Sequence, residues 1–495
     1  MAEREKLFGM SAEAGRWVFV VLGLIINLCL GSVYAYSVFK PQIELSYRIG
    51  GLKGNLPFMI FLAFFAVTMF FGGRLLEKWG PRVVGIIGGI IVAIGWALSC
   101  YTKDKDIMML VLTYGVIAGS GVGLAYGGPI AVAARWFPDK KGLAVGLTVA
   151  GFGGSAFITS KLADVLFLSQ AAKKLNISAP IMEGGKVAWN NFLNEALFTE
   201  LSKAMQKFTV PLDKIIKDMP GVEIADVLSK FDVFKGLLAN EKFSKYALNV
   251  IKTFGLHDTF FIFGAAFLVL LILLSLPLKF PVAGWKPAGW TPSAAAAASQ
   301  DFTRGEMVKT GTFWGLFLCF TFGSLAGLMA IGISSPVGQE VIEIAPSLAA
   351  TLVGVFAIFN ALGRPIFGAL TDKLTPRYAG ILNLAVILIM SGLMLISGKG
   401  MVALYVIAFI GFWMCLGGWL AIAPTSTATF FGLKNYANNY GVVFFGYGLG
   451  AIIGGIISGL AKDIFGSYKW AFAPTAGLAA LGIILALALI KTPKK

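Results

Sequence analysis

The chain has 495 residues, of which 57% are hydrophobic and only 13% are charged, and its mean hydropathy is +0.80. This balance is typical of an integral membrane protein and excludes a soluble enzyme with one large core. The formal net charge of +16 does not indicate nucleic-acid binding, because the basic residues are scattered through short loops between apolar runs.

The cysteine and histidine content argues against metal and hydrolase chemistry. Cys29, Cys100, Cys319 and Cys415 each fall inside an apolar segment without CxxC spacing, and His257 is the single histidine. A disulfide framework, a metal-ligand cluster and a Ser/His/Asp triad are therefore not indicated. We expect no metal site, no other cofactor and no enzymatic activity.

Apolar runs long enough to cross a bilayer predict an all-α membrane protein with twelve spans. The first run follows a charged start and is too long for a signal-peptide core, so we expect it to be retained. The spans are predicted at 17–39, 56–76, 83–101, 107–134, 142–168, 258–280, 311–334, 347–370, 378–397, 401–429, 438–461 and 469–490.

An even number of spans places both termini on one side of the membrane. Loops on that side, together with the span ends next to them, carry 19 Lys and Arg residues, and the short loops opposite, with the span ends next to them, carry 8. By the positive-inside rule, we expect a multi-pass protein of the plasma (inner) membrane with both termini in the cytoplasm.

The two halves of the chain repeat each other. Gly-Arg-Leu-Leu-Glu-Lys-Trp-Gly-Pro-Arg at 73–82 and Gly-Ala-Leu-Thr-Asp-Lys-Leu-Thr-Pro-Arg at 368–377 match at an offset of 295. Both loops fall on the same membrane side, so the sequence predicts two parallel six-helix repeats. The same offset maps Pro129 onto Pro424, Gly146 onto Gly441, Gly151 onto Gly446 and Gly153 onto Gly448.

The predicted domain order contains one insertion. Residues 1–168 and 258–280 form the N-terminal half, 281–310 a cytoplasmic linker and 311–495 the C-terminal half. Residues 169–257 form an insertion on the outer side, with helical apolar spacing at 189–208 and 234–251. Its 12 lysines and 9 acids fit amphipathic, solvated helices better than an anion-gathering surface, and its partner is not indicated.

Arg364 is the leading candidate for a binding residue. It lies in the apolar run 348–370, where an arginine costs about 2.5–3.5 kcal/mol on insertion, so we expect it to face a polar interior on a substrate path. Asn360 lies one turn earlier on the same face, and Pro365 leaves the Ala361 carbonyl without its helical donor. The alternative is a packing arginine paired with a buried carboxylate, but the spans offer almost none.

Aromatic side chains in glycine-rich spans are the candidates for completing this site. Tyr126 lies in span 4, and Tyr447 stands between two glycines of span 11, at the position that the repeat matches to Phe152. We expect Asn360, Tyr126 and Tyr447 to hydrogen-bond the bound substrate, and Phe152 and Leu420 to shape an apolar wall. Tyr34 is a further candidate for which a packing role is equally compatible.

Charged residues of the terminal-side loops are candidates for a cytoplasmic gate. Such groups can pair in one transport state and separate when the halves rock. The alternative is that they only set topology. The gate candidates are Glu77, Arg82, Arg135, Asp372 and Arg377.

Five motifs of the chain are distinctive in combination. The strongest are Arg-Trp-Phe-Pro-Asp-Lys-Lys-Gly at 135–142 and Asp-Phe-Thr-Arg-Gly-Glu-Met-Val-Lys-Thr-Gly-Thr-Phe-Trp at 301–314. The others are Gly-Ser-Val-Tyr-Ala-Tyr-Ser-Val-Phe at 31–39, Asn-Tyr-Gly at 439–441 and the paired Gly-Trp-x-Pro of the linker. Together they resemble the oxalate/formate antiporter family of the major facilitator superfamily, which is related to monocarboxylate transporters. The resemblance covers all twelve spans and excludes the insertion.

The resemblance implies a major facilitator fold with a carboxylate site between the halves and Arg364 at the family's span-8 arginine. The oxalate carrier has a lysine where this chain has Tyr447, so a small monocarboxylate such as lactate, pyruvate, acetate or formate is favoured over oxalate. Animal monocarboxylate carriers commonly have an aspartate where Asn360 stands. We expect a monomer that moves the anion by proton symport or exchange. Dicarboxylate exchange is one alternative, and a sensor or scaffold that uses the insertion is another.

Overall fold

The structure is a computed structural model. It describes residues 6–102, 106–177, 182–183, 186–187, 189, 193–206, 212, 215–216, 222–282, 285–287, 301–432 and 435–493. The predicted helix positions Phe192 and Phe208 lie outside these residues.

The N-terminal half begins with a short hairpin of β1 (Lys6–Leu7) and β2 (Met10–Ser11). Its helices are α1 (Ala12–Leu30), η1 (Gly31–Ala35), α2 (Tyr36–Tyr47), α3 (Gly51–Leu98), η2 (Ser99–Thr102), α4 (Ile107–Leu110), the π-helix η3 (Val111–Ala118), α5 (Gly119–Trp136), α6 (Lys141–Leu175) and α11 (Glu241–Ser275).

The described residues of the C-terminal half form helices joined by short loops. Its elements are α13 (Arg304–Met307), α14 (Gly311–Glu340), α15 (Pro346–Ile396), α16 (Val402–Phe431), α17 (Tyr436–Val443), α18 (Phe445–Phe465), η5 (Tyr468–Ala471) and α19 (Phe472–Leu489).

The helices agree with the predicted spans. Ten helical segments of the described chain are long and apolar enough to cross a membrane. One of them, Gly51–Thr102, holds two predicted spans on either side of a break at Gly80, and α6 coincides with the predicted fifth span. All twelve predicted spans therefore lie in helices.

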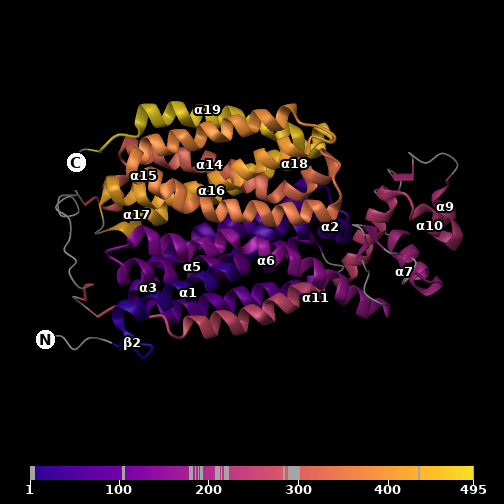
Figure 1. Cartoon of the computed structure of the whole chain (residues 1–495), viewed down its shortest axis with the longest axis horizontal. Coiled ribbons are helices and arrows are strands. Elements are labelled where there is room, and N and C mark those ends of the chain that lie inside the picture. The colour runs from indigo at the N-terminus through magenta and orange to yellow at the C-terminus, as the bar shows by residue number, and fades with distance from the viewer. Residues whose placement is uncertain are drawn as a thin grey trace.

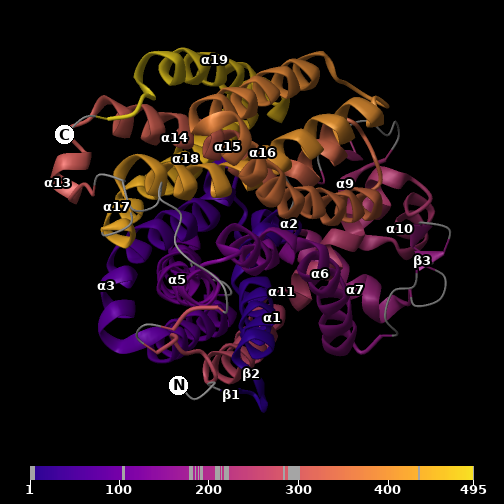
Figure 2. The same ribbon diagram turned by 60° about the vertical axis from the view of Figure 1, so that its left-hand side comes forward.

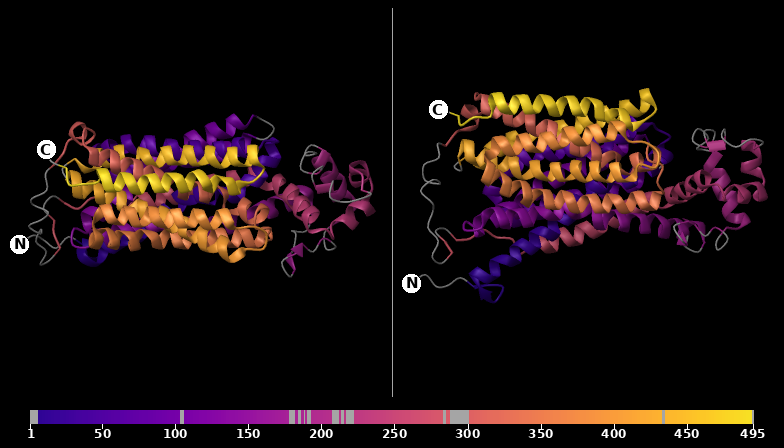
Figure 3. Two further views of the ribbon diagram at one scale, coloured as in Figure 1. Left: turned by 90° about the horizontal axis from the view of Figure 1, so that it is seen from above. Right: turned by 45° about the horizontal axis from the view of Figure 1, so that its top comes forward.

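The long helices run side by side in two bundles. α1, α3, α5, α6 and α11 form one bundle, and α14, α15, α16, α18 and α19 form the other (Figures 1 and 2). The β1–β2 hairpin and the end of α19 lie at one end, here named the terminal end. The insertion projects from the opposite end, here named the insertion end, as the views in Figure 3 also show.

The repeat is visible in the backbone, where both halves break at matching positions. Gly80 interrupts α3 with φ 77° and ψ 167°, and Thr375 interrupts α15 with φ 71° and ψ 154°. Each residue precedes a proline, which disfavours helical backbone at the residue before it. Glycine adopts this conformation freely, whereas threonine is strained in it.

Residues that the 295-residue offset matches also lie at the contact between the halves. α6 packs against α15, and α18 packs against α3. A Cβ at Gly153 of α6 would lie 3.0 Å from the backbone nitrogen of Ala361, and one at Gly448 of α18 would lie 2.8 Å from the Ala66 Cβ. These two glycines occupy equivalent places in the repeat and let the halves approach closely.

The insertion has a hydrophobic cluster of its own. The described elements are β3 (Met182–Glu183), β4 (Lys186–Val187), α7 (Glu195–Gln206), α9 (Ile224–Ser229) and α10 (Phe231–Leu237). Their buried side chains pack with the first turns of α11 around Leu201, Phe234 and Phe243. The predicted helix at 234–251 is divided, because the Asn240 side chain accepts from Lys242 N and Phe243 N and so starts α11 at Glu241.

The linker tryptophan Trp285 is half-buried and packs on the N-terminal half. Its ring lies 4.8 Å from that of Trp136, and the Arg16 guanidinium lies 5.8 Å from it. Arg16 also donates to both carboxylate oxygens of Asp139. This guanidinium holds the pKa of the Asp139 carboxyl below its ordinary value.

The two backbone breaks predict opposite effects of substitution. Gly80→Ala should lower the free energy of unfolding by about 1–3 kcal/mol, because a Cβ there meets no neighbouring atom and only the strained backbone is changed. Thr375→Gly should raise it by up to about 1 kcal/mol, since relief of strain is partly offset by greater freedom of the unfolded chain. Unfolding in detergent with chemical denaturant measures both.

Gly398→Ala is the matched control, because that glycine also has open space around its Cβ but no positive φ. Equal unfolding of Gly80→Ala and Gly398→Ala would contradict the assignment of strain.

Candidate functional site

Arg364 lies buried on α15 at the contact between the halves, with 1% of its surface exposed. Its Nη1 donates to the Val149 carbonyl of α6, in the other half. Its Nε and Nη2 are buried and have no hydrogen-bond partner in the part of the chain that the structure describes. No carboxylate of the described residues forms an ion pair with it, so the paired packing arginine is not what the structure contains.

These two nitrogens form one edge of the guanidinium. An edge of two parallel N–H groups is the geometry that binds a carboxylate bidentately. Leaving a buried donor unpaired costs about 1–3 kcal/mol, and more when the group is charged. The arrangement therefore favours an anion or water at this edge.

The predicted tyrosines meet at the same interface. The Tyr34 hydroxyl of η1 lies 2.7 Å from the Tyr447 hydroxyl of α18, so one phenol donates to the other across the halves. Tyr34 and Tyr126 both lie close enough to Arg364 for its charge to act on their phenols. Arg364, Tyr34, Tyr126 and Tyr447 are thus brought together.

Phe152 provides an aromatic wall for this group. Its ring lies 5.0 Å from Tyr34 and 5.3 Å from Tyr126, in both cases edge-on. Its role as a wall of the substrate site stays a prediction. Leu420 is buried on α16.

Asn360 is engaged by protein groups. Its Nδ2 donates to the Trp413 carbonyl of α16 at 2.8 Å. Its Oδ1 is buried without a partner in the described chain and faces Gly153 of α6, where an added Cβ would lie 2.6 Å away. Asn360 therefore joins α15 to α16 and leaves one acceptor at the contact between halves.

The predicted gate residues pair within their own halves. Arg135 of α5 forms an ion pair with Glu77 of α3, and Arg377 donates to the Leu487 carbonyl of α19. Arg82 is exposed, and the side chain of Asp372 lies outside the described residues. None of the described gate side chains forms an ion pair across the halves in this conformation.

Residues 18–170 match the sequence profile of the Major Facilitator Superfamily. Among solved structures, a bacterial homologue of the human lysosomal transporter Spinster superposes with a TM-score of 0.58 at 17% identity, over 96% of this chain and 97% of that one. The chain therefore carries a Major Facilitator Superfamily match at residues 18–170 and shares the all-helical fold of major facilitator transporters. The predicted major facilitator fold is confirmed.

Sequence relatives extend the likeness along nearly the whole chain. The Oxalate:formate antiporter of Oxalobacter formigenes is 24% identical over 461 residues, covering 92% of this chain and 86% of the relative. The human Monocarboxylate transporter 14 is 24% identical over 488 residues, covering 95% and 89%. The predicted resemblance to this group of multi-pass transporters is confirmed.

The sequence did not indicate two aromatic residues that lie beside this group, Phe65 and Phe444. Phe65 of α3 lies 5.6 Å from Phe152 and 5.8 Å from Tyr447, and it packs on Phe444 across the halves at 5.3 Å. With 41 phenylalanines in the chain, nothing in the sequence distinguishes these two. Their role becomes visible only when α3 and α18 are placed side by side.

The Tyr34–Tyr447 hydrogen bond predicts energetic coupling between the halves. Tyr34→Phe and Tyr447→Phe should each leave one buried hydroxyl without its partner. The free energy of unfolding of the double variant should therefore fall by less than the sum of the two single losses. The difference should be about 0.5–1.5 kcal/mol. Denaturant unfolding of the four proteins measures this coupling, and strictly additive losses would contradict it.

Proposed function

We propose that this protein carries a small monocarboxylate, such as lactate, pyruvate, acetate or formate, by alternating access between its two halves. The supporting observation is the buried edge of Arg364, where Nε and Nη2 have no partner among the described residues. A carboxylate bound there supplies two acceptors and cancels the buried charge.

The neighbouring residues suit a small acid. Tyr126 and the Tyr34–Tyr447 pair offer hydroxyl groups beside the guanidinium, and Phe152 with Phe65 offers apolar ring surface for a short carbon chain. The likeness to proteins named oxalate:formate antiporter and monocarboxylate transporter is consistent with this class of substrate.

The buried charge also bears on coupling. With the site empty, both halves must move around an unneutralised cation in a low-dielectric interior, so reorientation is easier when the site is loaded. We therefore propose exchange of anions or entry of the anion with a proton. Uptake that is faster into liposomes preloaded with the same acid favours exchange, whereas uptake driven by an imposed proton gradient favours symport.

The membrane orientation is part of the same proposal. We place both termini in the cytoplasm of a plasma (inner) membrane and the insertion outside, on the strength of the lysine and arginine distribution. Protease cleavage of the insertion in intact cells, compared with inverted vesicles, tests this orientation.

We expect removal of the Arg364 guanidinium to cause loss of transport. In proteoliposomes, Arg364→Ala should lower uptake of the preferred monocarboxylate by about 100-fold or more, because a charge-assisted bidentate contact is lost. Arg364→Lys should restore only part of the rate, since an ammonium lacks the planar fork. Radiolabelled lactate, pyruvate, acetate and formate are the substrates to measure.

Arg74→Ala is the control, because Arg74 is exposed on α3. Unchanged uptake of all four acids by a folded Arg364→Ala protein would refute the anchor.

Exchange of dicarboxylates is the second candidate, and the neutral phenol at Tyr447 weighs against it. A second carboxylate is best met by a second cation, which the resemblance places at this position in the oxalate carrier. Tyr447→Lys should therefore create or raise oxalate uptake and reduce uptake of the monocarboxylate. Strong oxalate uptake by the unaltered protein would instead favour the second candidate.

A further inference from the structure

A cluster of charged and amide groups joins the two halves at the insertion end, away from Arg364. Its central residue is Lys40 of α2, whose side chain has no exposed surface. Lys40 Nζ donates to Asn55 Oδ1 at 2.5 Å and to the Gly51 carbonyl at 3.4 Å. It lies 3.5 Å from the Glu44 carboxylate and 5.1 Å from the ring of Tyr468, which belongs to the other half.

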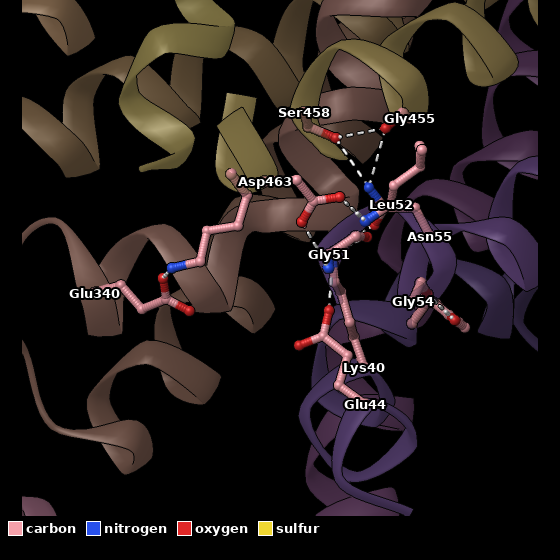
Figure 4. Close-up of polar contacts among 12 residues, drawn as sticks. Lys40, Glu44, Gly51, Leu52, Gly54, Asn55, Glu340, Gly455, Ser458 and Asp463 are labelled. Carbon is pink, nitrogen blue, oxygen red and sulfur yellow. Dashed lines mark hydrogen bonds and ion pairs between the residues drawn. The ribbon is translucent and has the colours of Figure 1, made fainter. Parts of the chain in front are cut away.

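Asn55 of α3 carries the connection across. Its Oδ1 accepts from Lys40, and its Nδ2 donates to the Gly455 carbonyl and to Ser458 Oγ of α18, each at 3.1 Å (Figure 4). The amide orientation is fixed, because only its oxygen can face the ammonium and only its nitrogen can face the carbonyl. Lys40 thereby positions the donor that binds the C-terminal half.

Asp463 makes a second connection in the opposite direction. The N-cap residue of α3, Gly50, supplies no side-chain hydrogen bond. The Asp463 carboxylate of α18 instead accepts from Gly51 N at 3.2 Å and from Leu52 N at 3.3 Å (Figure 4). A carboxylate from one half thus caps a helix of the other, where the helix dipole favours negative charge.

An ion pair of the C-terminal half borders these contacts. Lys462 of α18 pairs with Glu340 of α14, and its ammonium lies 5.3 Å from the Tyr468 ring. Glu44 of α2 is close enough to Lys462 to interact with its charge. An acid of the N-terminal half, Glu44, therefore lies near a lysine of the C-terminal half, Lys462, and the opposite charges attract.

We propose that Asn55 and Asp463 are the latch that holds the two halves closed at the insertion end, with Lys40 as its positioning residue. Opening this end breaks the Asn55 bonds to α18 and removes the Asp463 cap from α3. Lys40 and Asn55 stay together on the N-terminal half. The latch sets the ratio of open to closed protein, whichever anion is carried.

One substitution separates the contact across the halves from the contact within a half. Asn55→Asp keeps an acceptor for Lys40 but replaces the Nδ2 donor with an oxygen that faces the Gly455 carbonyl. It should raise the open-to-closed ratio at the insertion end by about tenfold or more, since even one lost interaction of this kind is worth about a factor of ten. Asp463→Ala should act in the same direction, and Ser458→Ala should have a smaller effect.

The measurement is a pair of distances by double electron–electron resonance on the full chain in nanodiscs. Spin labels on Lys53→Cys and Phe465→Cys report the insertion end, and labels on Lys78→Cys and Asn438→Cys report the terminal end, all at exposed positions. The half-buried Cys100 is replaced by serine. In the latch variants, the first distance should lengthen and the second should shorten.

Lys399→Ala is the matched control, because its ion pair with Glu343 lies within the C-terminal half. Unchanged distances in Asn55→Asp and in Asp463→Ala would overturn the latch, and so would an equal shift in Lys399→Ala. Ser458→Ala, which removes a single hydroxyl, decides the question if the stronger variants do not fold. No substrate is needed, so the result is independent of the proposed anion.

Discussion

The buried guanidinium of Arg364 is the constraint around which the interface between the halves is arranged. It lies in an apolar helix, yet its Nη1 donates to a backbone carbonyl of the opposite half. Tyr34 and Tyr126 of the N-terminal half and Tyr447 of the C-terminal half lie close enough for its charge to act on them. The charge therefore lies where the two halves meet, and in the proposed transport cycle the anion that neutralises it lies between them.

The repeat explains why this interface is built as it is. Gly153 and Gly448 occupy equivalent positions and allow close approaches between α6 and α15 and between α18 and α3. Gly80 and Thr375 break the equivalent helices. The polar residues do not follow the symmetry, because Tyr447 stands opposite Phe152 and Arg364 has no basic counterpart at position 69 of the first half, which is Met69. The scaffold is duplicated, whereas the buried guanidinium belongs to one half.

Apolar length and the 295-residue offset were sufficient to predict the helices and the parallel halves, because both signals are local to the chain. Arg364, Tyr126, Phe152 and Tyr447 were predictable for the same reason, as polar or bulky residues in spans of small apolar ones. Phe65, Phe444 and the Lys40–Asn55 pair were not. Their significance depends on which helix lies opposite, and the sequence of α3 carries no mark of its contact with α18.

The insertion is continuous with two long helices of the N-terminal bundle, α6 and α11. Its far end lies well beyond the contact between the halves (Figure 1). A small tilt of the N-terminal bundle therefore displaces that far end by more than it displaces the contact between the halves.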